Sequence, residues 1–254
     1  LFHALNRDRW AHVLKKNILP MIQRAKAAGK IRHIGFSFHD DLDVFKTILN
    51  GFDSWEFCQI QLNYMDVNYQ AGMEGLRLAH EKGLAVVIME PLRGGAIANV
   101  PEEVAQMLPK SPVESALDFL WNMPEVNVVL SGMSESQQVD QNLSYAERAH
   151  VGMLTEEENA AILAAGDKMR SFMQTPCTGC DYCNVCPQEI AIPKIFAIAN
   201  KLQLDGDYIR AGEEYKVLEG HTADQCVSCG LCVEQCPQHI KIFEELAKVH
   251  KRLA

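Results

Sequence analysis

The sequence lacks long hydrophobic runs and any concentration of positive charge. No apolar stretch approaches the roughly 18 residues that a membrane-spanning helix requires, and its first residues lack the basic and apolar regions of a signal peptide. The net charge is −9 without a stripe of Lys or Arg. Phosphate binding needs basic side chains, so this balance argues against nucleic acid as a partner. We therefore expect a cytoplasmic protein that binds neither membranes nor nucleic acid.

Cysteine is almost absent from the first 176 residues, where Cys58 is the only one of the nine. The other eight lie in two short runs near the C-terminal end. Disulfide frameworks usually spread their cysteines across a small secreted chain, whereas tight CxxC runs in an intracellular chain indicate metal binding. Cys58 is expected to be a small buried hydrophobic residue.

Each run contains three cysteines at CxxCxxC spacing, followed by a fourth that precedes proline. The runs are Cys177-x-x-Cys180-x-x-Cys183-x-x-Cys186-Pro187 and Cys226-x-x-Cys229-x-x-Cys232-x-x-x-Cys236-Pro237. Such a loop supplies three thiolates to one [4Fe–4S] cubane, and the fourth cysteine ligates the other cluster in two-cluster ferredoxins. The spacing therefore predicts two [4Fe–4S] clusters with crossed ligands. The predicted ligand sets are Cys177, Cys180, Cys183 and Cys236 for one cluster, and Cys226, Cys229, Cys232 and Cys186 for the other.

The alternative for these cysteines is a pair of Cys₄ zinc sites. Zinc sites usually combine CxxC pairs separated by longer loops, and not four consecutive cysteines before a proline. The apolar periodicity of residues 192–204, between the two runs, predicts a helix. The module therefore resembles the alpha-helical ferredoxins more than the compact β-rich type.

Residues 1 to 150 alternate between short apolar stretches and helical patterns. Five strands are predicted, at 1–5, 31–38, 56–62, 85–89 and 126–130. The principal predicted helices lie at 18–28, 42–49, 72–82 and 112–122. This alternation is typical of an α/β protein with a parallel sheet buried on both faces. A doubly wound sheet and part of a (β/α)₈ TIM barrel both fit, although no GxGxxG follows any strand, which weakens the first.

A composition change marks the domain boundary. Thr155 and Glu158 have the spacing of a capping box, which predicts a helix reaching Arg170. Beyond Pro176 the sequence becomes rich in cysteine. We therefore expect two domains, 1–175 and 176–254.

The strand ends carry short segments whose order resembles the aldo-keto reductase family. The segments are Leu1-Phe2-His3-Ala4-Leu5, Ile34-Gly35-Phe36-Ser37, Cys58-Gln59-Ile60-Gln61-Leu62-Asn63-Tyr64, Glu90-Pro91-Leu92-Arg93-Gly94-Gly95, and Leu130-Ser131-Gly132-Met133-Ser134 leading to Asn142-Leu143. They resemble the C-terminal part of that family's barrel, strands 4–8, so the chain is expected to lack the N-terminal third. Residues 155–254 resemble the 4Fe-4S extension found in one branch of the family.

The resemblance implies an NADP- or NAD-dependent reduction of a small aldehyde or ketone. His3 matches the His of the family's catalytic tetrad, which orients and polarises the substrate carbonyl, while the Asp, Tyr and Lys have no match here. The implied cofactor contacts are Ser37 and Gln59 for the nicotinamide carboxamide, Leu92, Gly94, Ser131, Gly132 and Ser134 for the phosphates, and Gln138 and Asn142 for the adenine. The phosphate assignment has a physical basis, because loops and a helix N-terminus at this end of a barrel bind phosphate.

Three departures from the family pattern concern the cofactor. Phe38 follows Ser37 where many relatives have Asn, and Met89 replaces an aromatic residue beneath the nicotinamide. No basic residue lies between Leu130 and Tyr145, so the choice between NADP and NAD stays open.

The resulting prediction is an oxidoreductase in two parts, a carbonyl reductase and an iron–sulfur electron-transfer domain. A separate redox partner protein is also expected. A cubane moves one electron at a time, whereas a nicotinamide exchanges a hydride, and no flavin motif is visible to connect them. Two alternatives follow: an electron carrier whose barrel is a non-catalytic scaffold, and a redox sensor.

Overall fold

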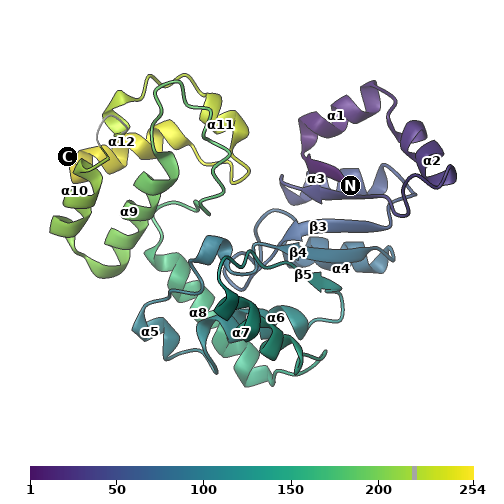
Figure 1. Cartoon of the computed structure of the whole chain (residues 1–254), viewed down its shortest axis with the longest axis horizontal. Helices are drawn as coiled ribbons and strands as arrows, with labels where there is room; N and C mark the ends of the chain where they lie inside the picture. The colour runs from purple at the N-terminus through teal and green to yellow at the C-terminus, as the bar shows by residue number, and fades with distance from the viewer. Residues whose placement is uncertain (219–221) are drawn as a thin grey trace. The chain divides into compact units, whose positions relative to one another are not determined.

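The computed structural model describes residues 1–218 and 222–254 and contains two compact units, Leu1–Gly166 and Asp167–Ala254. We call them the sheet unit and the cysteine unit (Figure 1). The division falls inside helix α8 (Glu156–Phe172). Within the described residues, no helix has both the length and the apolar character that crossing a bilayer requires.

The sheet unit is built on five parallel strands that lie in the order of the sequence. They are β1 (Phe2–Leu5), β2 (Gly35–Phe38), β3 (Phe57–Gln61), β4 (Ala85–Met89) and β5 (Val128–Val129). The predicted α/β class with a parallel sheet is confirmed. A doubly wound sheet reverses its strand order at a switch point, and the order here does not reverse. The eight-stranded barrel itself stays a prediction.

Helices connect the strands of this unit. They are α1 (Arg7–Lys15), α2 (Leu19–Ala27), α3 (Leu42–Asn50), α4 (Gly72–Glu81), α5 (Glu102–Ala105), α6 (Pro112–Trp121) and α7 (Ser136–Ala146). The four helices predicted between the strands are present, with ends within two residues of the predicted bounds. Helices α1 and α5 were not predicted. Helix α4 packs against β3 and β4, and α3 lies beside it (Figure 1).

Aromatic packing and one glycine hold β2 against its neighbours. The rings of Phe36 and Trp55 lie 4.8 Å apart between centroids, and both are buried. A Cβ on Gly35 would lie 2.5 Å from the Phe57 ring and from its carbonyl oxygen. Only glycine permits this close approach of β2 and β3, which aligns Ser37 opposite Gln59.

The predicted capping box at the start of α8 is confirmed. The backbone N–H of Glu158 donates to Thr155 Oγ1 at 3.2 Å, and the N–H of Thr155 donates to Glu158 Oε2 at 2.9 Å. Both donors would otherwise lack partners at a helix N-terminus. The helix continues to Phe172, two residues beyond the predicted end at Arg170.

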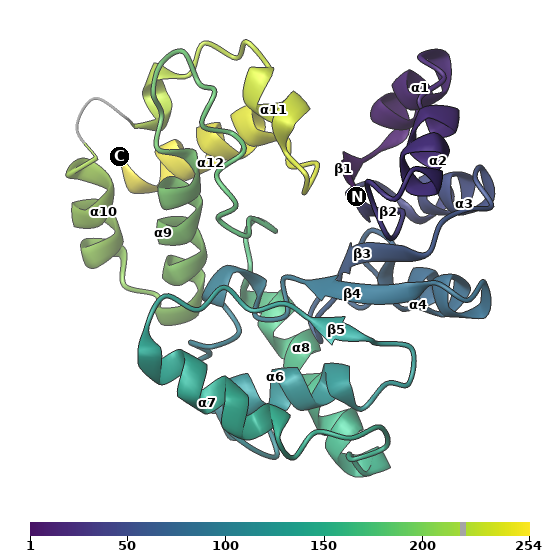
Figure 2. The ribbon, with the colours of Figure 1, turned by 45° about the vertical axis from the view of Figure 1, so that its right-hand side comes forward.

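The described elements of the cysteine unit are helices. They are α9 (Ile192–Asp205), α10 (Tyr208–Lys216), the 3₁₀ turn η2 (Ala223–Gln225), α11 (Leu231–Gln235) and α12 (Ile242–Leu253). Helix α9 packs against α10 and α12 (Figure 2). Their apolar faces form a core that includes Ile195, Phe196, Leu246 and Val249.

An internal repeat organises this unit. The segments Cys186-Pro187-Gln188-x-Ile190-x-Ile192 and Cys236-Pro237-Gln238-x-Ile240-x-Ile242 share sequence and backbone hydrogen bonds. In each copy the residue three after the cysteine donates its N–H to the cysteine carbonyl, at 3.0 Å and 3.1 Å. The last isoleucine of each copy begins a helix, α9 or α12. The unit therefore presents two similar surroundings for its cysteines.

Candidate functional site

Two cavities divide the eight cysteines of the cysteine unit four and four. The lining of the first cavity includes Cys177, Cys180, Cys183 and Cys236. The lining of the second cavity includes Cys186, Cys226, Cys229 and Cys232. Each cavity takes three cysteines from one run and its fourth from the other. The structure thus brings together the same residues as the ligand sets predicted from the spacing.

Both CxxCxxC loops contain residues in the left-handed backbone conformation. In each run, a residue with positive φ lies on both sides of the middle cysteine. These are Gly179 and Asp181, with φ of 74° and 64°, and Ser228 and Gly230, with φ of 52° and 84°. For the two residues with a Cβ, this conformation costs roughly 1–2 kcal/mol each. The cost indicates that the loop shape serves a ligand set more than local stability.

Burial raises the pKa of some of these thiols. Burial, followed by the neighbouring Cys177 and Cys180, raises the pKa of Cys183 to about 12. Burial, followed by Cys186, also raises the pKa of Cys232. Such thiols are poor nucleophiles at neutral pH, whereas a metal-bound cysteine is deprotonated by the charge of the metal. The surroundings therefore suit metal ligation better than thiol catalysis.

Among the described residues, no group of three or more His, Cys, Asp or Glu side chains could hold a single metal ion. A tetrahedral zinc site with Zn–S bonds of about 2.3 Å brings its sulfurs within about 3.8 Å of one another. A cubane of four irons and four sulfides is larger and needs ligands further apart.

A buried hydroxyl also lines the first cavity. Thr178 is only 7% exposed, and its Oγ1 has no hydrogen-bond partner in the described structure. Buried hydroxyls are normally satisfied, so an acceptor brought by a ligand explains this one. Together with four thiols, the unpartnered hydroxyl shows that the residues of the first cavity fit an iron–sulfur cluster.

A second polar site lies at the carboxyl ends of β3 and β4, and sequence reasoning missed it. Asp66 accepts hydrogen bonds from Gln61 Nε2 at 2.8 Å, Asn63 Nδ2 at 3.0 Å and Arg93 Nε at 3.1 Å. All four side chains are at least nine-tenths buried. The sequence signal for this site is the appearance of polar residues directly after two buried strands.

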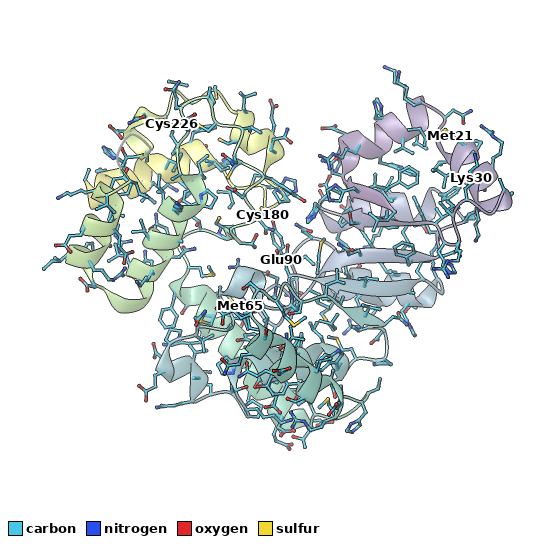
Figure 3. The ribbon with its side chains drawn as sticks, in the orientation of Figure 1. Met21, Lys30, Met65, Glu90, Cys180 and Cys226 are labelled. Carbon is cyan, nitrogen blue, oxygen red and sulfur yellow. The ribbon has the colours of Figure 1, made fainter. Side chains whose placement is uncertain are left out.

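Glu90 lies next to this site, at the end of β4 (Figure 3). Its backbone carbonyl accepts from Asn63 Nδ2 at 3.0 Å, and its carboxylate accepts from the backbone N–H of Gly94. The other carboxylate oxygen is buried, and no group among the described residues forms a hydrogen bond with it. Burial raises the pKa of this carboxyl group above its ordinary value. Glu90 is therefore a carboxyl group that readily accepts a proton.

The residues predicted to contact the nicotinamide end lie on the first three strands. His3 is exposed on β1, and Ser37 is buried on β2 with its Oγ accepting the N–H of Ala4 at 2.7 Å. Gln59 lies opposite Ser37 on β3, and its Nε2 is 3.5 Å from Met89 Sδ. The structure thus brings Ser37, Gln59 and Met89 together.

The residues predicted for the phosphates and adenine form two separate groups. Gly94 and Leu92 lie at the 3₁₀ turn η1 (Arg93–Gly95), where the Gly94 N–H already donates to Glu90. In the loop after β5, Asn142 Nδ2 donates to Ser131 Oγ at 3.0 Å. A Cβ added at Gly132 would have no described neighbour within 4 Å.

Hydrogen bonds at the N-terminus of α7 already occupy the amide oxygen of Gln138, a residue predicted to contact the adenine. Gln138 Oε1 accepts the N–H of Ser134 at 2.8 Å, and Gln138 completes a capping box with Glu135. Its amide oxygen therefore serves the helix N-terminus, and the Nε2 group is left for any ligand contact.

Comparisons with known proteins match two separate parts of the chain. The aldo/keto reductase family model matches residues 6–167, and the model of a 4Fe-4S dicluster domain matches residues 176–240. The chain therefore belongs to the aldo/keto reductase family and carries a 4Fe-4S domain behind its reductase domain.

Solved aldo-keto reductases are among the structures to which this chain is similar. The holo form of AKR11C1 from Bacillus halodurans is 24% identical, with a TM-score of 0.49 over 56% of this chain and 53% of that one. Its apo form gives a TM-score of 0.48 at 24% identity, covering 56% of this chain and 54% of that one. The thermostable aldo-keto reductase Tm1743, in complex with the inhibitor epalrestat, is 19% identical, with a TM-score of 0.45 over 57% and 52% of the two chains. The chain spans about half the length of these proteins. A comparison with curated proteins gave no match.

Proposed function

We propose that this chain is an iron–sulfur oxidoreductase whose cysteine unit binds two [4Fe–4S] clusters. The division of eight cysteines between two cavities carries this proposal. The first cavity would ligate one cluster through Cys177, Cys180, Cys183 and Cys236, and the second would ligate the other through Cys226, Cys229, Cys232 and Cys186. When bound, such clusters store and pass single electrons.

The two clusters would lie close together in apolar surroundings. Ile192 at the start of α9 lines both cavities, so the cavities are neighbours. Phe196 and Ile242 add to the lining of the first cavity, and Leu246 adds to that of the second. These apolar side chains would lower the local dielectric around the clusters, a factor that affects cluster potentials.

Anaerobic purification of the full chain tests the proposal. We expect about eight irons and about eight acid-labile sulfides per chain, the content of two cubanes. The matched control is Cys58→Ala, because Cys58 is fully buried in β3 of the sheet unit and should leave the iron content unchanged. Stoichiometric zinc without iron or sulfide would overturn the proposal.

For the sheet unit, we propose an NADP- or NAD-dependent reduction of a small aldehyde or ketone. Membership of the aldo/keto reductase family supports this activity. The position of Ser37 opposite Gln59 on adjacent strands also supports it. The cofactor would supply a hydride, Ser37 and Gln59 would orient its carboxamide, and His3 would polarise the substrate carbonyl. Its phosphates would contact Leu92, Gly94, Ser131, Gly132 and Ser134, and its adenine would contact Gln138 and Asn142.

Titration with NADPH and NADH, followed by fluorescence, tests the nicotinamide site. We expect saturable binding that Gln59→Ala weakens, and aldehyde-dependent oxidation of the nucleotide that His3→Ala slows. Gln23→Ala is the control, because Gln23 is exposed on α2. Absence of nucleotide binding by the intact chain would contradict this part of the proposal.

One observation favours the alternative of an electron carrier with a non-catalytic sheet unit. The Gly94 N–H, a predicted phosphate donor, is already bonded to the Glu90 carboxylate, whose charge would repel a phosphate. Arg93 in the same loop is buried against Asp66. Tighter nucleotide binding by Glu90→Gln would favour the reductase, and no binding by either form would favour the carrier.

Electron exchange between the nicotinamide and the clusters is limited by the number of electrons that each transfers. A hydride carries two electrons to one carbon, whereas each cluster accepts one electron. Direct exchange would need a group that separates the pair. The clusters are therefore proposed to serve a redox partner protein and not the hydride transfer itself.

A further inference from the structure

The two cysteine cavities differ at equivalent positions of their CxxCxxC loops. Thr178 follows the first cysteine of its run, and Val227 follows the first cysteine of the other. Thr178 is 7% exposed, whereas Val227 is 61% exposed. Each of them lines its own cavity. Only the first cavity therefore has a side-chain hydroxyl at this position.

Among the described residues, the hydroxyl of Thr178 has no hydrogen-bond acceptor. Its Oγ1 is buried, and no described group forms a hydrogen bond with it. A buried hydroxyl without a partner is destabilising, so it is normally paired in the functional state. The acceptors that cluster binding would bring to this cavity are sulfides.

We propose that the Thr178 hydroxyl donates a hydrogen bond to the cluster in the first cavity and raises its reduction potential. This inference rests on the proposed binding of two clusters. Reduction adds one electron to the cluster, and a donated hydrogen bond favours the more negative state. No bond is broken and no proton is transferred. Val227 has no hydroxyl, so the second cluster receives no such bond from the equivalent position.

Charge makes a second difference between the cavities. Asp181 lines the first cavity where Gly230 occupies the equivalent position of the second. A carboxylate near a cluster opposes reduction, so its effect is opposite to that of the Thr178 hydroxyl. The contribution of Thr178 is therefore measured by substitution, with Asp181 unchanged.

An anaerobic redox titration of the full chain, followed by electron paramagnetic resonance, tests the inference. Thr178→Val keeps the side-chain shape and removes the hydroxyl. At the wild-type midpoint of the affected cluster, we expect its oxidised-to-reduced ratio to rise about tenfold, which corresponds to a shift of about −59 mV for one electron. Thr178→Ser should restore the wild-type value. Val227→Thr is the matched control and should shift neither midpoint, because its exposed hydroxyl would bond to water.

The same samples, exchanged into deuterium oxide, give an independent readout. We expect a deuterium coupling to the reduced cluster in the wild type and in Thr178→Ser, and its loss in Thr178→Val. Unchanged midpoints in Thr178→Val at full iron content would overturn the inference. Loss of iron from Thr178→Val would also overturn it, since the hydroxyl would then be required for assembly. Wild-type protein without iron would instead overturn the proposed function.

Discussion

Single buried polar residues shape the edge of the sheet where β3 and β4 end. Asp66 has three donors from side chains that are themselves buried, and one of them, Arg93, carries a full charge. A buried ion pair is stable only when further hydrogen bonds satisfy its remaining groups. Gln61 and Asn63 meet that condition here, so the site is preorganised without a ligand.

Substitution Asp66→Asn should destabilise the sheet unit strongly. The substitution removes the Asp66 carboxylate that pairs with the buried Arg93 guanidinium. The amide nitrogen that replaces one carboxylate oxygen cannot accept hydrogen bonds from Gln61 or Asn63. We expect a loss of about 3–5 kcal/mol of unfolding free energy. Denaturation in urea measures it by tryptophan fluorescence, because Trp10, Trp55 and Trp121 all belong to the sheet unit.

The control for that experiment is the exposed ion pair of Lys46 and Glu74. Glu74→Gln should change the free energy by no more than about 1 kcal/mol. Equal effects of the two substitutions would show that burial of the Asp66 pair does not matter for stability.

Glu90 gives a pH-dependent prediction at the same scale. Because burial raises the pKa of its carboxyl group in the folded state, ionisation opposes folding. Stability should fall as pH rises from the unfolded pKa, about 4.3, through the higher folded value. Glu90→Gln should therefore melt at a higher temperature than the wild type at pH 8, and the difference should disappear near pH 4. A lower melting temperature for the variant at pH 8 would contradict the assigned burial effect.

At the scale of elements, Glu56 connects the end of α2 to the start of β3. Its carboxylate pairs with Lys26, bonds to His33 Nδ1 at 2.8 Å and accepts the backbone N–H of Ile34 at 3.1 Å. Hydrogen bonds from Lys26 and then His33 lower the pKa of Glu56 to about 2. This arrangement fixes the loop between α2 and β2.

Glu56→Gln tests that connection. A lowered folded pKa means that the stabilisation is complete above the unfolded value and is lost as pH falls through about 2. The partners are partly exposed, so we expect a loss of about 1 kcal/mol at pH 7. The difference between variant and wild type should shrink between pH 5 and pH 2 in thermal melts. A constant difference over that range would show that the loop does not depend on the charge.

The elements predicted from the sequence were those with strong local signals. Apolar runs marked all five strands, and Gly29 and Gly83 directly follow two of the predicted helices. Helix α1 was missed because only Trp10 and Val13 are buried on it, too few for a clear periodicity. The role of Gln138 in a capping box was missed because its partner Glu135 is an uncommon N-cap residue.

At the scale of the whole molecule, the two cysteine runs must meet in space for the clusters to form. Crossed ligation predicts how double variants behave. Cys177→Ser with Cys236→Ser removes two ligands from one cluster and should leave about half of the iron. Cys226→Ser with Cys236→Ser removes one ligand from each cluster and should lose more than half. Iron and sulfide assays on anaerobically purified protein measure both. The reverse pattern would show that each run ligates its own cluster.

The sequence by itself determined the chemistry of the cysteine unit, because iron–sulfur ligation depends on thiol spacing over a few residues. It also indicated the parallel sheet, since apolar runs and helical periodicity are local properties. The tertiary structure decided which four cysteines share each cavity, because Cys186 and Cys236 reach the opposite loops only after α9 and α12 pack together. It also decided the burial of Asp66 with Arg93 and the unpartnered hydroxyl of Thr178, since burial depends on residues that are distant along the chain.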